Sequence, residues 1–416
     1  MKFLEDLASR RRFGMRPGLD AIRTVCAALG DPQKSLRALH VAGTNGKGAV
    51  CALLDAALRA RGLRVGRYTS PHLVRLNERF FLDGAPIPDS VLEQKSALVN
   101  QAIRQSNNHT ISDLTFFEAL TAVAFSLYAD AKVDYAVLEC GLGGRLDATN
   151  VCCPDLCVIT RIGLDHCDWL GDTVESIAGE KAGIVKSGVP IVLGRNDPSV
   201  RAVVEKRARE VGAPFFSAPE LVTEADIPDT FALGGTFNRE NAVTALAALK
   251  VLLGDGDDVR AAVRQGFGKV VWPGRFQRIG DVLVDGAHNP PAARALAEAL
   301  DGEKVALVAG FCGDKDVDRV LAILAPCVTR GFAVRTNNPR SLSAESTAAK
   351  MRAAGIASVA CDGLPDALER ARRTGGTTLV CGSLFLAGEA LVALGATPSP
   401  TPRFDPSELL SPNVLT

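Results

Sequence analysis

The stretch LHVAGTNGKGAV, residues 39–50, has the residue types of a loop that binds phosphate. A short apolar strand runs into glycines and Lys47, and an apolar helical pattern follows. Backbone amides and one ammonium can therefore converge on a nucleotide's phosphates. Gly48 and Ala49 follow the lysine and carry no hydroxyl for Mg²⁺, so a metal ligand must come from another segment. The alternative is a glycine-rich turn with an incidental lysine.

Three further apolar runs end in residues that can bind a metal. Ser70 follows RVGRYT, Glu139 ends DYAVLE before the glycine-rich CGLGG, and His166 follows DLCVIT. Parallel strands deliver their carboxyl ends to one edge of a sheet, so these groups are expected near the phosphate loop. A hydroxyl, a carboxylate and a neutral imidazole can each bind Mg²⁺, although oxygen ligands are preferred. The alternatives are a Ser-Pro turn, a solvated glutamate and a structural histidine.

Later residues add cations and a second set of strand-end groups. Arg275 in PGRFQ offers a planar cation for phosphate, and Asp285 and His288 follow the apolar run DVLV. Asn289 precedes two prolines, which is typical of a helix N-cap. Lys181, taken alone, is interpreted as a surface lysine.

Alternating apolar runs and helical patterns predict an α/β fold with parallel sheets. We expect an N-terminal P-loop-type ATPase domain with a mainly parallel sheet in residues 1–276. A smaller, Rossmann-like C-terminal α/β domain is expected in residues 277–416, with a loosely held proline-rich tail. The interrupted stretch 270–280 is predicted to be an extended crossover and hinge, with a ligand cleft between the domains. The expected strands are ALHVA, RVGRYT, DYAVLE, DLCVIT, VPIVLG, DVLVDGA, KVALVAG and TTLVCGS, and the clearest helices lie at 50–62 and 239–254.

Composition excludes several classes of protein. Lys plus Arg and Asp plus Glu both number 47 in 416 residues, which argues against a broad nucleic-acid or anionic-membrane surface. The N-terminus MKFLEDLASRRR places acidic residues where a secretion signal would need its apolar core, and no uncharged run reaches the roughly 18 residues of a membrane span, so we expect a cytoplasmic protein. The 11 cysteines lack paired CxxC motifs and are expected to be mainly buried, reduced thiols.

The ordered motifs GTNGKG, TSPHL, TFFE, ECGLGGRLDATN, LDHCDWLG, GEKAGI, PGRFQ and DGAHNP resemble the folylpolyglutamate synthase and dihydrofolate synthase family, relatives of the muramyl peptide ligases. The resemblance spans roughly residues 13–388. It implies that ATP converts a pterin-bearing carboxylate into an acyl phosphate, which the amine of L-glutamate then attacks to form an amide. It also implies two Mg²⁺ ions, K⁺, and a dihydropteroate or reduced folate substrate. Nothing in the pattern demands more than a monomer.

The resemblance assigns roles residue by residue. Lys181 matches a family lysine that CO₂ carbamylates, and with His166 and Glu139 it forms the catalytic set. The metal ligands would be Ser70, Glu139, His166 and Lys181. The ATP-binding residues would be Thr44, Asn45, Gly46, Lys47, Asn241, Arg275, Asp285 and His288. The pterin substrate would meet Thr115, Phe116, Phe117, Glu118, Leu146, Asp147 and Ala148, together with the loop Gly14–Pro17.

Ala49 departs from the family pattern, which has serine or threonine at this position. The substitution removes a phosphate or metal contact and predicts lower nucleotide affinity. Two alternatives stay open: a muramyl-type ligase acting on a peptidoglycan precursor, and a nucleotide-binding regulatory protein without catalysis.

Overall fold

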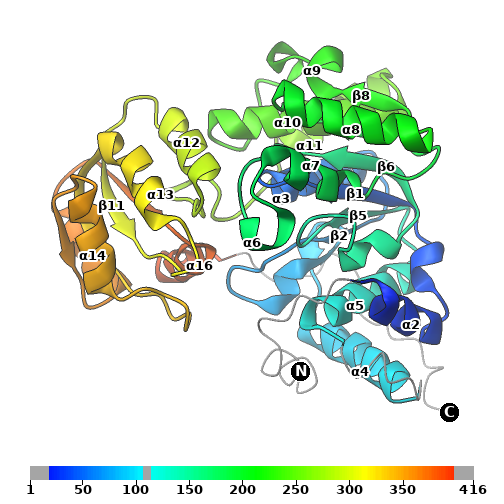
Figure 1. Ribbon diagram of the computed structural model, residues 1–416, viewed down its shortest axis with the longest axis horizontal. Coiled ribbons are helices and arrows are strands. Elements are labelled where there is room, and N and C mark those ends of the chain that lie inside the picture. Colours follow the sequence, from blue (N-terminus) through cyan, green and yellow to red (C-terminus); the bar gives the residue numbers. More distant parts are fainter. Residues whose placement is uncertain (1–17, 106–113, 398–416) are drawn as a thin grey trace.

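The computed structural model describes residues 18–105 and 114–397 and has two lobes, each built on its own sheet (Figure 1). The predicted pterin-contacting loop Gly14–Pro17 and the tail from residue 398 onward lie outside the described residues. The α/β class expected from the sequence is confirmed, because both sheets are mainly parallel and helices cover them.

The first lobe holds an eight-stranded sheet of order β4-β3-β2-β5-β1-β6-β7-β8. All neighbouring pairs from β2 to β8 are parallel, whereas β3 and β4 form an antiparallel edge. The strands are β1 (Ala38–Ala42), β2 (Val65–Tyr68), β3 (Phe80–Leu82), β4 (Ala85–Pro86), β5 (Tyr135–Glu139), β6 (Pro154–Ile159), β7 (Ile191–Leu193) and β8 (Phe215–Ser217).

Helices cover both faces of this sheet, since apolar side chains alternate along its buried strands. Leu39 and Val41 of β1 pack toward α3, α10 and α11, whereas Ala38 and Ala42 face the side that carries α2, α4, α5, α7 and α8. The helices are α2 (Asp20–Ala28), α3 (Lys47–Ala60), α4 (Asp89–Gln105), α5 (Phe116–Asp130), α6 (Cys167–Leu170), α7 (Val174–Ala182), α8 (Pro198–Val211), α9 (Ala218–Leu221), α10 (Thr236–Leu253) and α11 (Asp257–Phe267).

The second lobe holds a six-stranded sheet of order β13-β12-β11-β14-β10-β9, in which only β9 is antiparallel to its neighbour. Its strands are β9 (Gln277–Ile279), β10 (Val282–Val284), β11 (Val305–Ala309), β12 (Val328–Ala333), β13 (Ser358–Ala360) and β14 (Thr377–Cys381). Its helices are α12 (Pro290–Ala299), α13 (Val317–Leu324), α14 (Ala344–Ala353), α15 (Leu364–Arg372) and α16 (Leu384–Ala393).

The stretch 270–280 differs from the expected extended crossover. It turns at Pro273 and Gly274, and Gln277–Ile279 then pairs with β10 as an edge strand. The reason is physical: beyond the turn, the unpaired backbone groups of this stretch find partners along the free edge of β10. Only residues up to the turn therefore form the connection between the lobes.

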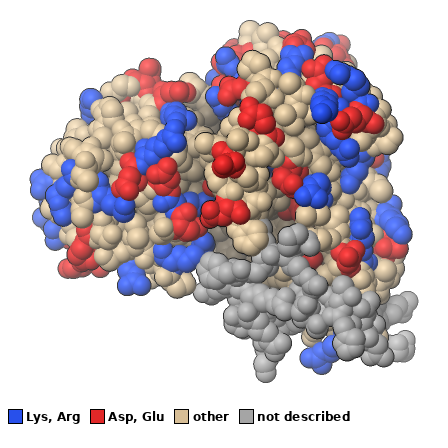
Figure 2. Space-filling model, viewed as in Figure 1, with Lys and Arg blue, Asp and Glu red and all other residues tan. Residues whose placement is uncertain are grey.

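The surface and the thiols agree with the composition. Figure 2 shows basic and acidic side chains intermixed on the visible face. All 11 cysteines are free, and most of them are buried. Within the described ranges, no helix combines the length and apolar character needed to cross a bilayer.

Candidate active site

The predicted phosphate loop connects β1 to α3. Gly46 adopts a left-handed conformation with φ 87° directly before Lys47, which begins the helix. A side chain at Gly43 would also be excluded, because its Cβ would lie 1.8 Å from Oγ1 of Thr160. Thr160 Oγ1 donates to the carbonyl oxygen of Asn45 at 2.7 Å, and Lys47 Nζ donates to the carbonyl oxygen of Thr44 at 3.2 Å. The loop is therefore held by a hydrogen bond within itself and by a second one from Thr160, which directly follows β6.

Residues from distant segments close over this loop. A Cβ added to Gly46 would lie 2.2 Å from Oδ1 of Asn241, so this side chain from α10 touches the loop. A Cβ at Gly48 would lie 2.2 Å from Cζ2 of Trp272 in the connection between the lobes. The guanidinium of Arg275 lies 6.0 Å from the centroid of the same tryptophan ring. The connection between lobes thus packs on the first turn of α3.

Ser70 and Glu139 meet at the ends of β2 and β5. The backbone N–H of Ser70 donates to Oε2 of Glu139 at 2.9 Å, and the glutamate is only 4 % exposed. Burial raises the pKa of Glu139, while Lys47 and the Ser70 amide oppose that rise. Within the described residues neither Glu139 Oε1 nor Ser70 Oγ has a hydrogen-bond partner, so both oxygens are available to a cation.

The glycine-rich loop after Glu139 packs closely against other parts of the same lobe. A Cβ at Gly141 would lie 2.7 Å from the Phe117 ring, and one at Gly144 would lie 2.8 Å from the carbonyl oxygen of Lys181. Both glycines therefore lie in close contact with other parts of the same lobe. The groups they approach are the rings of α5 and the backbone of α7.

Lys181 is the most perturbed cation of the site. It lies in the last turn of α7, is 4 % exposed and has no hydrogen-bond or ion-pair partner in the described part of the chain. Burial, helped by repulsion from Lys47, lowers the pKa of Lys181 from 10.5 to about 7. The interpretation of Lys181 as a surface lysine is therefore wrong, because its side chain is buried inside the first lobe. Near neutral pH a large fraction of this amine is uncharged and nucleophilic.

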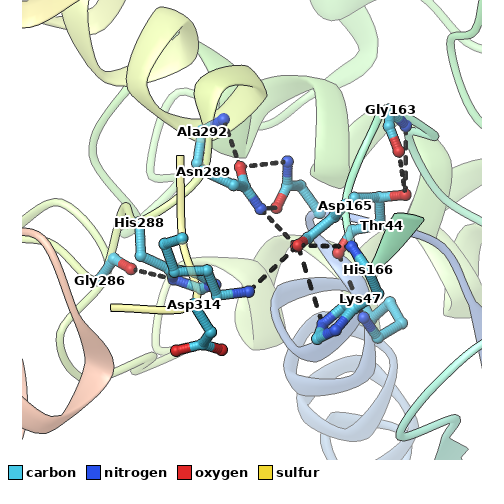
Figure 3. A network of polar contacts seen from close by, with 12 residues as sticks. Thr44, Lys47, Gly163, Asp165, His166, Gly286, His288, Asn289, Ala292 and Asp314 are labelled. Carbon is cyan, nitrogen blue, oxygen red and sulfur yellow. Dashed lines mark hydrogen bonds and ion pairs between the residues drawn. The ribbon is translucent and has the colours of Figure 1, made fainter. Parts of the chain in front are cut away.

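A polar network joins the two lobes at this edge (Figure 3). Asp165 accepts hydrogen bonds from Asn289 Nδ2 at 2.7 Å and from Lys315 Nζ at 3.1 Å. Asn289 also contacts Asn45 of the phosphate loop at 3.4 Å. His166, next in the chain to Asp165, holds a left-handed φ of 53° at the start of α6, and its side chain is 44 % exposed.

The charges of this network are coupled. Burial would raise the pKa of Asp165, but Lys315 and the neighbouring histidines lower it well below its usual range. Burial lowers the pKa of His166, so its imidazole is neutral at pH 7 and free to bind a metal. Sequence reasoning missed Lys315 and its contact with Asp165. The available signal was GDKD, which follows an apolar strand.

The predicted groups of the second lobe lie beside Arg275. Asp285 accepts hydrogen bonds from the backbone amides of Phe276 and Ala287, both at 2.8 Å. Burial raises the pKa of Asp285, opposed by the Arg275 guanidinium. His288 contacts the carbonyl oxygen of Gly286 at 2.8 Å, and burial lowers the pKa of His288 to about 4. These side chains stand at the strand end that faces the first lobe.

Several predicted pterin contacts have structural partners. Oε2 of Glu118 accepts from the Thr115 backbone amide at 2.8 Å, which closes a capping box at the start of α5. Asp147 accepts from the amides of Gly141 and Leu142, both at 2.9 Å, and so shapes the glycine-rich loop. The other predicted contacts, Phe116, Phe117, Leu146 and Ala148, flank these two residues in the chain. Ala148 is buried, and Phe116, Phe117 and Leu146 are half-buried.

The donor set fits a hard cation that also binds phosphate. No group of three or more His, Cys, Asp and Glu side chains forms a protein-only metal site in the described ranges. Mg²⁺ usually takes one or two protein oxygens and completes its shell with water and substrate phosphates. Glu139, Ser70 and the neutral His166 supply such a partial set beside Lys47.

Fold and site together define an ATP-dependent ligase of the Mur type. Residues 41–219 match the Mur ligase middle domain, and residues 274–384 match the Mur ligase glutamate ligase domain. The chain is 39 % identical over 321 residues to dihydrofolate synthase/folylpolyglutamate synthase of Bacillus subtilis, covering 70 % of this chain and 74 % of that protein. The chain belongs to the dihydrofolate synthase/folylpolyglutamate synthase family.

Solved structures extend the likeness over nearly the whole chain. FolC of Escherichia coli in complex with DHPP and ADP is 33 % identical, with a TM-score of 0.84, and the match covers 95 % of this chain and 97 % of that one. A bifunctional folylpolyglutamate synthase/dihydrofolate synthase of Yersinia pestis, complexed with AMPPNP and a Mn ion, is 33 % identical with a TM-score of 0.82, over 95 % and 97 % of the two chains.

Proposed function

We propose that the chain joins L-glutamate to dihydropteroate, to the glutamate tail of reduced folates, or to both, in a reaction driven by ATP. The observation that carries the proposal is the convergence of Lys47, Glu139 and the buried Lys181 at one sheet edge, where Lys47 acts on the pKa of both other groups. The names of the relatives and the nucleotides and metal in their structures support it. We further propose a cytoplasmic monomer.

Each charged side chain has a task in the transfer of a phosphoryl group to a carboxylate. Lys47 and Arg275 offset the negative charges that this transfer brings together in a buried space. Mg²⁺, when held by Ser70, Glu139 and His166, would supply further neutralisation. Asn241, which touches Gly46, holds the phosphate loop in shape.

Lys181 takes part after reaction with CO₂. Its uncharged amine nitrogen forms a bond to the carbon of CO₂ and loses one proton, which leaves a carbamate anion where a cation stood. The lowered pKa of Lys181 favours this reaction, because about half of the amine is already unprotonated at neutral pH. The carbamate oxygens then complete the metal-binding set.

The second lobe protects the intermediate. The contacts of Asp165 with Lys315 and Asn289 hold the lobes together at the catalytic edge. Excluding water there protects an acyl phosphate from hydrolysis until the amine of L-glutamate attacks its carbonyl carbon.

The test is ADP release by the pure protein with ATP, magnesium and potassium. L-Glutamate is combined with dihydropteroate in one series and with a reduced folate in another. We expect glutamate-dependent turnover in at least one series and none in Glu139→Gln. Nucleotide binding without turnover in either series would overturn the proposal and favour the regulatory alternative suggested by Ala49.

A further inference from the structure

A cavity of about 650 Å³ opens on the first lobe, away from the candidate active site. Pro154, the first residue of β6, lies in its wall, whereas the active site follows the opposite end of the same strand. Six residues of strand separate the two edges by roughly 17 Å at about 3.3 Å per residue. The end of α2, two 3-10 helices (Pro32–Lys34 and Ala148–Val151) and the segment before β7 supply the remaining wall.

The wall carries an excess of positive charge. Arg23, Lys34 and Lys186 line the cavity, against one carboxylate, Asp31. Lys34 Nζ lies 2.7 Å from Asp31 Oδ2, so these two charges neutralise each other. Arg23 reaches its nearest carboxylate, in Asp20, only at 3.9 Å across exposed surface. Two cationic side chains are therefore left to attract an anion.

In the described part of the chain, Lys186 has only neutral hydrogen-bond partners. Its ammonium donates to the backbone and side-chain oxygens of Asn150 at 3.0 and 2.7 Å. These bonds fix the position of the ammonium without cancelling its charge. A cation held in this way is preorganised for an incoming anion.

A buried acceptor in the wall lacks a partner. Gln33 is 4 % exposed, and its Nε2 donates to Asp31 Oδ1 at 3.0 Å, which fixes the orientation of the amide. Its Oε1 is buried without a hydrogen-bond partner. Buried acceptors are nearly always satisfied, so a small rotation of the Gln33 amide toward the cavity would let this oxygen accept from an N–H or O–H donor there. Ala27, Val151 and Val189 make the rest of the wall partly apolar.

We propose that this cavity binds a small organic anion that carries a hydroxyl or amino donor beside a carboxylate or phosphate group. The anionic group lies between Arg23 and Lys186, and the donor satisfies Gln33 Oε1. The volume falls within the range of about 300–1,000 Å³ that small-molecule sites occupy. None of the sequence-predicted site residues lines this cavity.

The cavity is also connected to the catalytic segment. Asn150, which holds Lys186, donates through Nδ2 to the carbonyl oxygens of Arg145 at 3.0 Å and Gly183 at 3.2 Å. Gly183 follows the helix that ends with Lys181 and Ala182. An anion bound to the Lys186 ammonium therefore acts, through Asn150, on contacts next to the catalytic lysine, and this part of the proposal rests on the proposed function.

The binding test uses Cys153, an exposed thiol in the cavity wall, as a reporter. The rate of maleimide alkylation is followed by peptide mass spectrometry with glycerol 1-phosphate, malate or neutral glycerol. Half-buried Cys327, in the second lobe, serves as the internal reference. At ten times the Kd of a probe about one cavity in eleven is empty, so Cys153 labelling should slow about tenfold. Greater protection by one of the two anions identifies phosphate or carboxylate as the preferred group.

Variants localise the effect. Arg23→Gln and Gln33→Met should each raise the Kd of the anion at least about tenfold, which leaves about twofold protection at the same concentration, whereas Lys206→Gln, an exposed substitution on α8, should not. Arg23 is exposed, so its variant keeps the fold even where Gln33→Met does not. Equal labelling rates with either anion and with glycerol, or full protection in Arg23→Gln, would overturn the binding proposal. Unchanged ADP release with the cavity filled would overturn the connection to catalysis alone.

Discussion

Replacing Lys181 by methionine should make the chain more stable while it removes activity. Methionine keeps the unbranched apolar stem of the lysine and leaves out the charge. Burial and Lys47 lower the pKa of Lys181 from 10.5 to about 7. At about 1.36 kcal/mol per pKa unit, the folded chain at pH 7 carries a cost of roughly 4–5 kcal/mol for this one proton.

The sign of the pH dependence follows from that pKa. Between pH 7 and 10.5 the unfolded chain binds the Lys181 proton more tightly than the folded chain does, so the wild-type free energy of unfolding rises with pH. The advantage of Lys181→Met is therefore full below pH 7 and disappears near pH 10.5. Urea denaturation at a series of pH values measures both changes.

Bicarbonate separates the carbamate from a merely buried amine. CO₂ that reacts only with the folded amine stabilises the wild type by mass action, and Lys181→Met offers no amine to react. Lys186→Met is the matched control, because that ammonium is hydrogen-bonded to Asn150 and its loss should destabilise the fold. The reasoning is refuted if Lys181→Met is less stable than the wild type at pH 7 or keeps full ADP release. Added acetate should restore part of the activity of Lys181→Ala, because the shorter side chain leaves room for the carboxylate.

Three further substitutions test the loop and the contact between lobes. Gly48→Ala places a Cβ 2.2 Å from the Trp272 ring, so activity should fall more than tenfold and stability by about 1–3 kcal/mol, with partial recovery in the double variant that adds Trp272→Leu. Ala49→Ser should change kcat/KM within about tenfold, or roughly 1.4 kcal/mol, and a larger gain would show that the absent hydroxyl limits catalysis. Lys315→Met leaves the partly buried Asp165 without its cation and should lower the free energy of unfolding by roughly 1–3 kcal/mol. Small-angle scattering should show a larger radius of gyration for Lys315→Met, and an unchanged radius would contradict its role between the lobes.

The buried strands of the sequence were predictable, whereas the edges were not. All eight predicted strands exist, because parallel strands buried on both faces are continuous apolar runs. β3, β4, β8, β9, β12 and β13 were not among the predicted strands. β12 contains Arg330 and Gly331 and is exposed over its first half, so its pattern lacks that apolar run. The domain division at residues 276 and 277 stays a prediction.

The site was predictable where strand ends determine it, and not where the lobes meet. Lys315 and Asp165 are 150 residues apart, and their contact depends on the orientation of one lobe on the other, which no local pattern encodes. The segment TFFE shows a different limit. Its Thr115 and Glu118 form a capping box, a helix-start signal that sequence reasoning assigned to substrate contact alone.

The geometry of the neighbouring strands explains why the loop does not need a hydroxyl directly after Lys47. The loop is fixed by Thr160, whose hydroxyl donates to the Asn45 carbonyl, so a hydroxyl in the first turn of α3 is not needed to hold its shape. Ser70 is tied to Glu139 through its backbone amide, which leaves the hydroxyl and one carboxylate oxygen free at the same point. Two oxygens at the ends of adjacent strands can bind a magnesium ion in place of a hydroxyl in the loop. With alanine at position 49, the chain therefore keeps the oxygen pair that we propose as metal ligands.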